Sequence, residues 1–92
     1  MSPALHYPFP PARAYRLNRC LYAIKSDADF CARFLADPRG AGAEMELSEA
    51  EHAALSPIDR DALAKLGAHP YLIFMAELRL RMAREPAALE YF

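Results

Sequence analysis

Neither sign of charge is in excess in this 92-residue sequence, since eleven basic and twelve acidic side chains give a net charge of -1. Without an excess of positive charge there is no broad field to attract phosphate backbones or anionic lipid. Long apolar runs are also missing: no stretch approaches the roughly twenty apolar residues that cross a bilayer. Residues 1–11 lack the basic start and apolar run of a signal peptide. We therefore expect a cytoplasmic protein that binds neither nucleic acid nor a membrane.

Cysteine and histidine are scarce as well. Cys20 and Cys31 lie eleven residues apart, without a C-x-x-C pair or a histidine at zinc-finger spacing, so we expect two buried free thiols. His6, His52 and His69 fall in three separate segments, and no H-E-x-x-H motif favours a metal site built from two histidines and a carboxylate. The sequence therefore indicates no catalytic residue, no metal ligand and no cofactor in this chain.

Proline is concentrated at one end of the chain. Four of the first eleven residues are proline, so most of this backbone is unable to enter a helix, and we expect residues 1–11 to form an extended arm. Residues 12–92 suffice for a single domain with a modest core. They show no strand-like alternation and no internal repeat. The sequence predicts an all-α fold, a compact bundle of about five short helices that follows the arm.

Apolar spacing and capping residues predict the helix boundaries. Apolar residues recur at three- and four-residue steps from about residue 12, which predicts the first helix. Polar caps, glycine and proline mark the other boundaries. In chain order these are Ser26 at the start of a second helix, Pro38 with Gly40 and Gly42 at its end, the Ser48 and Glu51 capping box of a third, Ser56, Pro57 and Asp59 at the start of a fourth, Gly67 at its end, and Pro70 at the start of a fifth.

The last predicted helix is apolar on two sides. On a helical wheel of about 100° per residue, one sector resembles an ordinary core-facing stripe. A separate sector is also apolar, and leaving its larger side chains in water would forgo roughly 1.5–3 kcal/mol each. We therefore expect that second sector to be a subunit interface; the alternative is a central helix that the other four surround. The expected core stripe is Tyr71, Phe74, Met75, Leu78 and Met82, and the expected interface is Leu72, Ile73, Ala76 and Leu80.

The first helix carries a polar aromatic stripe away from its apolar side. Tyr15, Asn18 and Tyr22 recur at three- and four-residue steps, and tyrosine offers both apolar area and a hydrogen-bonding tip. The stripe suits an interface, to which we assign Tyr22, or the wall of an aromatic pocket; plain exposure to solvent is the alternative. His69 precedes Pro70 at the mouth of the last helix. It would either cap that helix and satisfy the turn, or face a ligand.

Five short segments, taken in order, resemble the small alpha subunit of LigAB-type extradiol ring-cleavage dioxygenases, the family of protocatechuate 4,5-dioxygenase. They are Tyr15-Arg-Leu-Asn18, Phe34-Leu-Ala-Asp37, Leu47-Ser-Glu-Ala-Glu51, the predicted helix from Asp59 to Leu66, and Gly67-Ala-His-Pro-Tyr71. The order and spacing of these segments carry the resemblance. It departs from the family at Ala68-His69-Pro70, where longer members have a Gly-Asn pair.

This resemblance implies a division of labour between two kinds of chain. The large beta subunit would hold Fe(II) on two histidines and a carboxylate, and the present chain would cover the active-site mouth without a cofactor of its own. The complex would contain two of each chain and would cleave a catechol-type aromatic ring. His69, Tyr71, Tyr15 and Asn18 are then the candidates to face the substrate. The alternative hypothesis is a helical protein-interaction module that uses the same scaffold to recognise a peptide or another enzyme.

Overall fold

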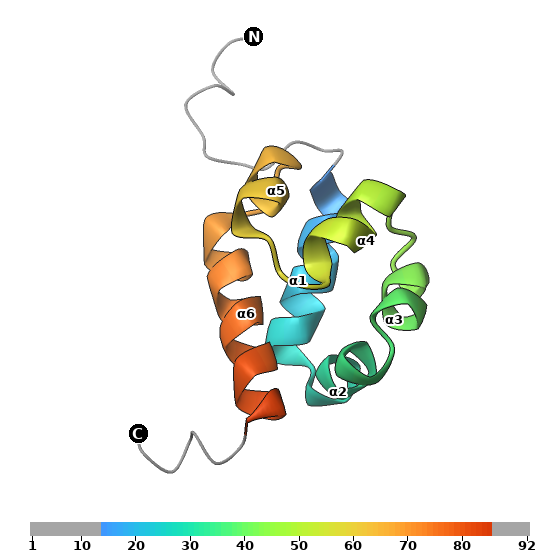
Figure 1. The fold of residues 1–92 in the computed structure, drawn as a ribbon, viewed down its shortest axis with the longest axis vertical. Coiled ribbons are helices and arrows are strands. Elements are labelled where there is room, and N and C mark those ends of the chain that lie inside the picture. The colour runs from blue at the N-terminus through green and yellow to red at the C-terminus, as the bar shows by residue number, and fades with distance from the viewer. Residues whose placement is uncertain (1–13, 86–92) are drawn as a thin grey trace, which may run out of the picture.

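The computed structural model describes residues 14–85, so the expected arm, residues 1–11, lies outside the described residues. Within this range the chain forms six helices and no strand, which confirms the all-α prediction (Figure 1). None of these helices combines the length and the apolar character that crossing a bilayer requires. The helices are α1 (Tyr15–Ser26), α2 (Ala28–Ala36), α3 (Pro38–Glu44), α4 (Glu49–Leu55), α5 (Arg60–Lys65) and α6 (Pro70–Arg84).

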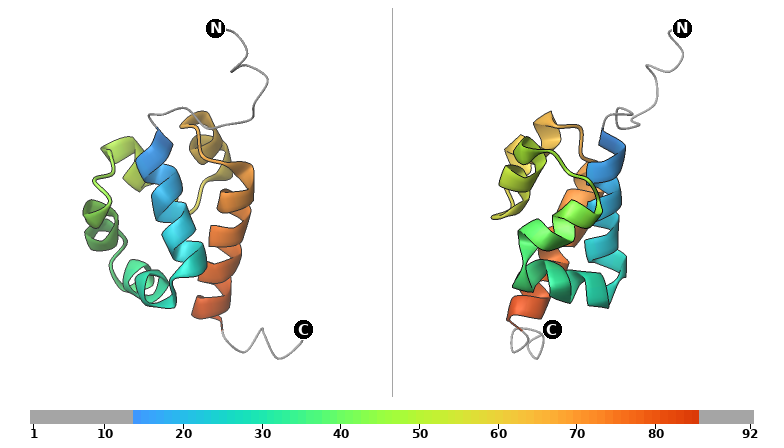
Figure 2. Two further views of the ribbon diagram at one scale, coloured as in Figure 1. Left: turned by 180° about the vertical axis from the view of Figure 1, so that it is seen from behind. Right: turned by 90° about the vertical axis from the view of Figure 1, so that its right-hand side faces the viewer.

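The two longest helices, α1 and α6, lie side by side and point the same way. Both run from the top of Figure 1 to the bottom, and the view from behind in Figure 2 shows them adjacent. The shorter helices α2 to α5 return along the other side of the molecule and close a ring against this pair. Because α1 and α6 make the most extensive helix contact, the side chains between them decide how the core is organised.

Side-chain caps fix where several helices begin. Ser48 and Glu51 form the predicted capping box: the Glu51 N–H donates to Ser48 Oγ at 3.2 Å, and the Ser48 N–H donates to Glu51 Oε1 at 2.8 Å. Two other caps differ from the prediction by a few residues. Asp27, instead of Ser26, accepts the first N–H groups of α2, and Asp59 caps α5 downstream of Ser56. In both cases an aspartate replaces the expected serine, and its carboxylate also favours the positive end of the helix dipole.

Pro38 opens a helix that the sequence analysis did not predict. It was expected to end the second helix, but Asp37 accepts a hydrogen bond from the Gly40 N–H at 3.1 Å and starts α3. Proline suits the first helical position, because its missing N–H would have no partner there. Residues 14–85 therefore form six helices instead of about five. Gly67 at φ 100° and Pro70 at the start of α6 confirm the predicted turn between the last two helices.

Apolar side chains from every helix meet in one core. The helix α1 contributes Leu17, Cys20, Leu21 and Ile24, and α2 contributes the Phe30 and Phe34 rings. Both cysteines are buried and free, as predicted.

The structure reverses the two predicted sides of α6. Ile73, Ala76 and Leu80 are buried at 5 %, 0 % and 3 % exposure, and Leu72 is half-buried against the same core. The prediction that this sector is a subunit interface is therefore wrong, since this chain's own helices cover it. Tyr71, from the expected core stripe, is exposed instead.

Packing explains the choice between the two sectors. Ala76 stands in the middle of the buried sector and is fully buried, and a small side chain at such a position lets a neighbouring helix pack closely. Burying the other sector would place the bulky Phe74 ring between the helices and would require a partner for the Tyr71 hydroxyl. The alternative of a surrounded central helix is not what the structure shows either, because Phe74 and Tyr71 lie on the outside.

This orientation predicts unequal costs for the same substitution on α6. Leu80→Ala should lower the free energy of unfolding by about 2–5 kcal/mol, because it leaves a cavity in the core. Leu78→Ala, on the half-exposed side, should cost less than about 1.5 kcal/mol. Urea unfolding followed by circular dichroism measures both values. Equal losses, or a larger loss for Leu78→Ala, would contradict the assignment of the two sides.

Candidate functional site

The large hydrophobic side chains that the described residues leave exposed are confined to two helices. Tyr15 and Tyr22 on α1 are 67 % and 56 % exposed, and Tyr71 and Phe74 on α6 are 53 % and 57 % exposed. We call these four residues the aromatic face. Single exposed aromatics are ordinary, but four on one pair of adjacent helices are typical of a surface that another molecule covers.

Helix geometry turns the four side chains away from the core. Tyr15 and Tyr22 are seven residues apart, or about two turns, so they share one side of α1. Tyr71 and Phe74 are three residues apart on the side of α6 that faces away from the core. Figure 2 shows that α1 and α6 themselves lie side by side, and Phe74 also lines a shallow hollow with Arg60, Asp61 and Ala64 of α5.

Asn18 joins α1 to the turn that precedes α6. Its side-chain Nδ2 donates to the Ala14 carbonyl at 3.1 Å and to the Gly67 carbonyl at 3.3 Å. Its Oδ1 accepts from the His69 N–H at 2.7 Å. The amide has two donor hydrogens, and both are used inside the protein. Asn18 therefore positions the turn, and the structure leaves it no hydrogen to donate to a substrate.

His69 caps α6, as one of its two predicted roles requires. Its Nδ1 accepts a hydrogen bond from the Tyr71 N–H at 3.1 Å, which satisfies one of the open donors at the start of the helix. The structure thus gives His69 and Asn18 positioning roles in the turn, whereas Tyr15, Tyr22 and Tyr71 remain accessible.

Positive charge is concentrated on the same two helices. Residues 15–26 and 70–85 contain six basic side chains and two acidic ones, whereas residues 27–69 contain nine acidic and four basic side chains. Lys25 lies over the Tyr22 ring, with Nζ 5.0 Å from its centroid, and Arg79 Nε donates to the Lys25 carbonyl at 3.0 Å. The chain is nearly neutral as a whole, but the aromatic face belongs to its basic layer. The basic residues of this layer are Arg16, Arg19, Lys25, Arg79, Arg81 and Arg84.

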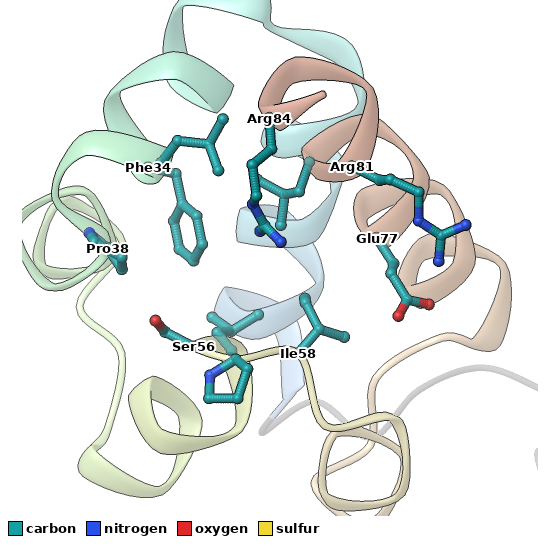
Figure 3. Close-up of a pocket in the computed structure, with 11 residues that line it drawn as sticks. Phe34, Pro38, Ser56, Ile58, Glu77, Arg81 and Arg84 are labelled. Carbon is teal, nitrogen blue, oxygen red and sulfur yellow. The ribbon is translucent and has the colours of Figure 1, made fainter. Parts of the chain in front are cut away.

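A cleft of about 320 Å³ opens between α2, the α4–α5 turn and the second half of α6 (Figure 3). Phe34, Leu55 and Leu80 supply buried apolar walls, and the Arg84 side chain extends over the opening. No pattern in the sequence predicts this cleft, because its walls come from segments far apart in the chain.

The two thiols are poorly suited to nucleophilic chemistry. Burial, assisted by the negative charge of Glu51, raises the pKa of the Cys20 thiol to about 12. Burial also raises the pKa of Cys31, although the Arg79 cation lowers it in part. A thiol attacks as the thiolate, so both groups are held in their unreactive form at neutral pH. Across residues 14–85 there is no group of three or more His, Cys, Asp or Glu side chains arranged to hold a metal ion.

Comparisons of the chain with protein-family models, with curated proteins and with solved structures give no match. The resemblance to the small subunits of ring-cleavage dioxygenases therefore remains a prediction from the sequence.

The hydrogen bonds of Asn18 predict a local stability effect. Asn18→Ala should lower the free energy of unfolding by about 1–3 kcal/mol, because it removes the hydrogen-bond partner of the half-buried His69 N–H and Gly67 carbonyl. Arg19→Ala, at the exposed neighbouring position of the same helix, should change it by less than about 0.5 kcal/mol. Chemical denaturation checks both variants. If Asn18→Ala were as stable as Arg19→Ala, the described role of Asn18 would be wrong.

The raised thiol pKa values predict slow chemical labelling. At pH 8.5 the folded chain should react with a disulfide reagent such as DTNB roughly a hundredfold more slowly than the chain unfolded in guanidinium. The raised pKa of Cys20 in the folded state also means that this thiol stabilises the fold below pH 9, and that its contribution is lost as the pH rises toward 12. Absorbance at 412 nm follows the labelling. Equal rates for folded and unfolded chain would show that the thiols are not buried.

Proposed function

We propose that this chain is a non-catalytic helical subunit that binds a larger protein through the aromatic face. The observation that carries the proposal is that the exposed large hydrophobic side chains of residues 14–85 are gathered on one pair of adjacent helices. Tyrosine and phenylalanine are enriched at protein interfaces, because they bring a large apolar area at a low cost in side-chain entropy.

The area of the face is compatible with the centre of such an interface. A fully buried aromatic side chain removes about 150–250 Å² from water. With somewhat more than half of each side chain exposed, the four residues could bury roughly 350–600 Å², and each partner in a standard interface buries about 800 Å². Half-buried Met75 and Leu78, together with the basic residues around the face, would supply the remainder.

The charge of the surrounding layer favours one kind of partner surface. Lys25 and Arg79 lie beside the face, and α1 contains no acidic residue. An apolar patch ringed by carboxylates would complement it, and such pairs of opposite charge speed association and select the partner. A second copy that docked through the same face would bring like charges together.

We further propose, from the sequence resemblance, that the larger protein is the catalytic subunit of an Fe(II)-dependent extradiol dioxygenase. In this proposal the iron and its ligands belong to that subunit, and two copies of each chain assemble. The present chain covers the active-site mouth and keeps water from the reacting centre. Tyr15 and Tyr71 are the candidates to approach a catechol-type substrate, because they are exposed on the aromatic face. Ile73, Ala76 and Leu80 have no part in the contact.

The test uses the product of the neighbouring reading frame as the binding partner. Phe74→Asp and Tyr22→Asp should each weaken binding at least about tenfold, because a buried charge without a partner opposes association. Ala32→Asp, at an exposed position of α2 outside the face, is the matched control and should bind like the unaltered chain. Size-exclusion chromatography and calorimetry measure binding, and circular dichroism verifies that all three variants fold.

Two outcomes would separate the parts of the proposal. If Phe74→Asp and Tyr22→Asp bind like the control, the aromatic face is not the interface. If the face binds the neighbouring protein but the purified complex holds no iron and cleaves no catechol, the dioxygenase assignment fails while the interaction module stands. Stoichiometric iron and ring cleavage by the isolated chain would refute the non-catalytic role.

A further inference from the structure

A shallow hollow lies between α5 and the start of α6, and apolar side chains in it are open to solvent. Phe74 is 57 % exposed, and Pro70 and Ala64 are exposed as well, whereas Ile73 is buried beside them. The hollow has a volume of about 330 Å³. A chain segment that covered it would remove exposed apolar surface from water, which favours docking. The residues that line the hollow are Arg60, Asp61, Ala64, Pro70, Ile73 and Phe74.

The residues that precede α1 join the described structure close to this hollow. Ala14 is fully buried, and Asn18 Nδ2 donates both to the Ala14 carbonyl at 3.1 Å and to the Gly67 carbonyl at 3.3 Å. One side-chain group therefore holds the attachment point of the preceding residues beside the turn between α5 and α6. Figure 1 shows α5 and the starts of α1 and α6 at the same end of the molecule.

The chain before Ala14 is long enough to reach the hollow. An extended proline-rich chain advances about 3.1 Å per residue, so Phe9 and Tyr7 can lie roughly 15 and 22 Å from Ala14. The hollow spans the first five residues of α6, a rise of about 6 Å, and it begins three residues after Gly67. Even with the 8–10 Å that separates the axes of packed helices, this surface is within reach.

The composition of the arm, residues 1–11, matches the hollow. Tyr7 and Phe9 are each followed by proline, and proline-rich segments dock in grooves lined by aromatic side chains. The charges are complementary too. Asp61 lines the hollow, and no basic side chain within residues 14–85 lies in ion-pair range of it. The first thirteen residues contain no acidic side chain and end on Arg13, so they bring only positive charge toward Asp61.

We infer that the arm of this same chain docks in the hollow, with the Phe9 ring against Phe74 and Ala64. The covalent connection selects this occupant, because a short linker gives the arm an effective concentration of the order of millimolar. The inference concerns the isolated chain and does not depend on a partner. Phe74 also belongs to the aromatic face, so a protein that binds there as proposed would have to displace the arm.

The experiment is nuclear Overhauser spectroscopy on the isotope-labelled 92-residue chain. The Phe9 ring should give cross-peaks to the Ala64 methyl group and to the Phe74 ring. The Tyr7 and Phe9 amides should have heteronuclear Overhauser values close to those of the helices. An isotope-filtered spectrum of mixed labelled and unlabelled chains should contain no such cross-peak, because each arm docks on its own chain.

Variants test the hollow and the arm separately. Ala64→Arg should remove the cross-peaks, because it obstructs the hollow and repels the positive arm. Ala32→Arg makes the same change at an exposed position of α2, so it is the matched control and should retain them. Phe9→Ser leaves the hollow intact and should lower the heteronuclear Overhauser value of Tyr7. Circular dichroism verifies that the variants fold.

Four results would overturn the inference. They are the absence of the cross-peaks in the unaltered chain, their persistence in Ala64→Arg, their appearance between copies in the mixed sample, and an unchanged Tyr7 value in Phe9→Ser. Because all of these are measured on the isolated chain, they are independent of whether a partner binds the aromatic face.

Discussion

The packing of α6 against α1 determines which side chains this protein presents to other molecules. Ile73, Ala76 and Leu80 are buried in the core, and α1 and α6 share the most extensive contact between two helices. Once that sector is inside, Tyr71 and Phe74 are turned to the solvent by helix geometry alone. The aromatic face and one wall of the cleft are therefore consequences of a single choice in the core. Asn18 adds the hydrogen bonds that align the start of α6 with α1.

Local signals in the sequence predict the helices well, and they fail where several signals compete. The capping box at Ser48, the glycine turn at Gly67 and the start at Pro70 all have one physical solution, and the structure has them. Pro38 has two possible structural roles, since proline ends one helix as readily as it begins the next. The preceding Asp37 decides between them, because it supplies the cap that α3 requires. The sequence analysis did not give Asp37 that role.

The wrong prediction for the orientation of α6 has a different cause, because no local signal in the sequence shows which side of this helix faces the core. Both sectors of the helix are apolar. The periodicity of the sequence therefore shows two apolar sides, but it does not show which of them packs into the core. In the structure the core takes the sector with the smaller side chain, so Ala76 is buried and the bulkier Phe74 ring is exposed. Of the predicted site residues, Tyr15 and Tyr22 are exposed as an interface requires, while Asn18 and His69 serve the turn. The cleft was not predicted, because residue spacing in the sequence does not show which distant segments will line the same cleft.

Which side of α6 faces water is the central claim, and it is open to direct measurement. Paramagnetic relaxation by a soluble gadolinium chelate, read at the methyl groups of the folded chain, reports exposure without any substitution. The account predicts weak relaxation at Ile73 and Leu80 and strong relaxation at Leu78 and Met82, which are partly exposed. Strong relaxation at Ile73 and Leu80, with protection of Leu78 and Met82, would contradict the packing, and the aromatic face would lose its physical basis.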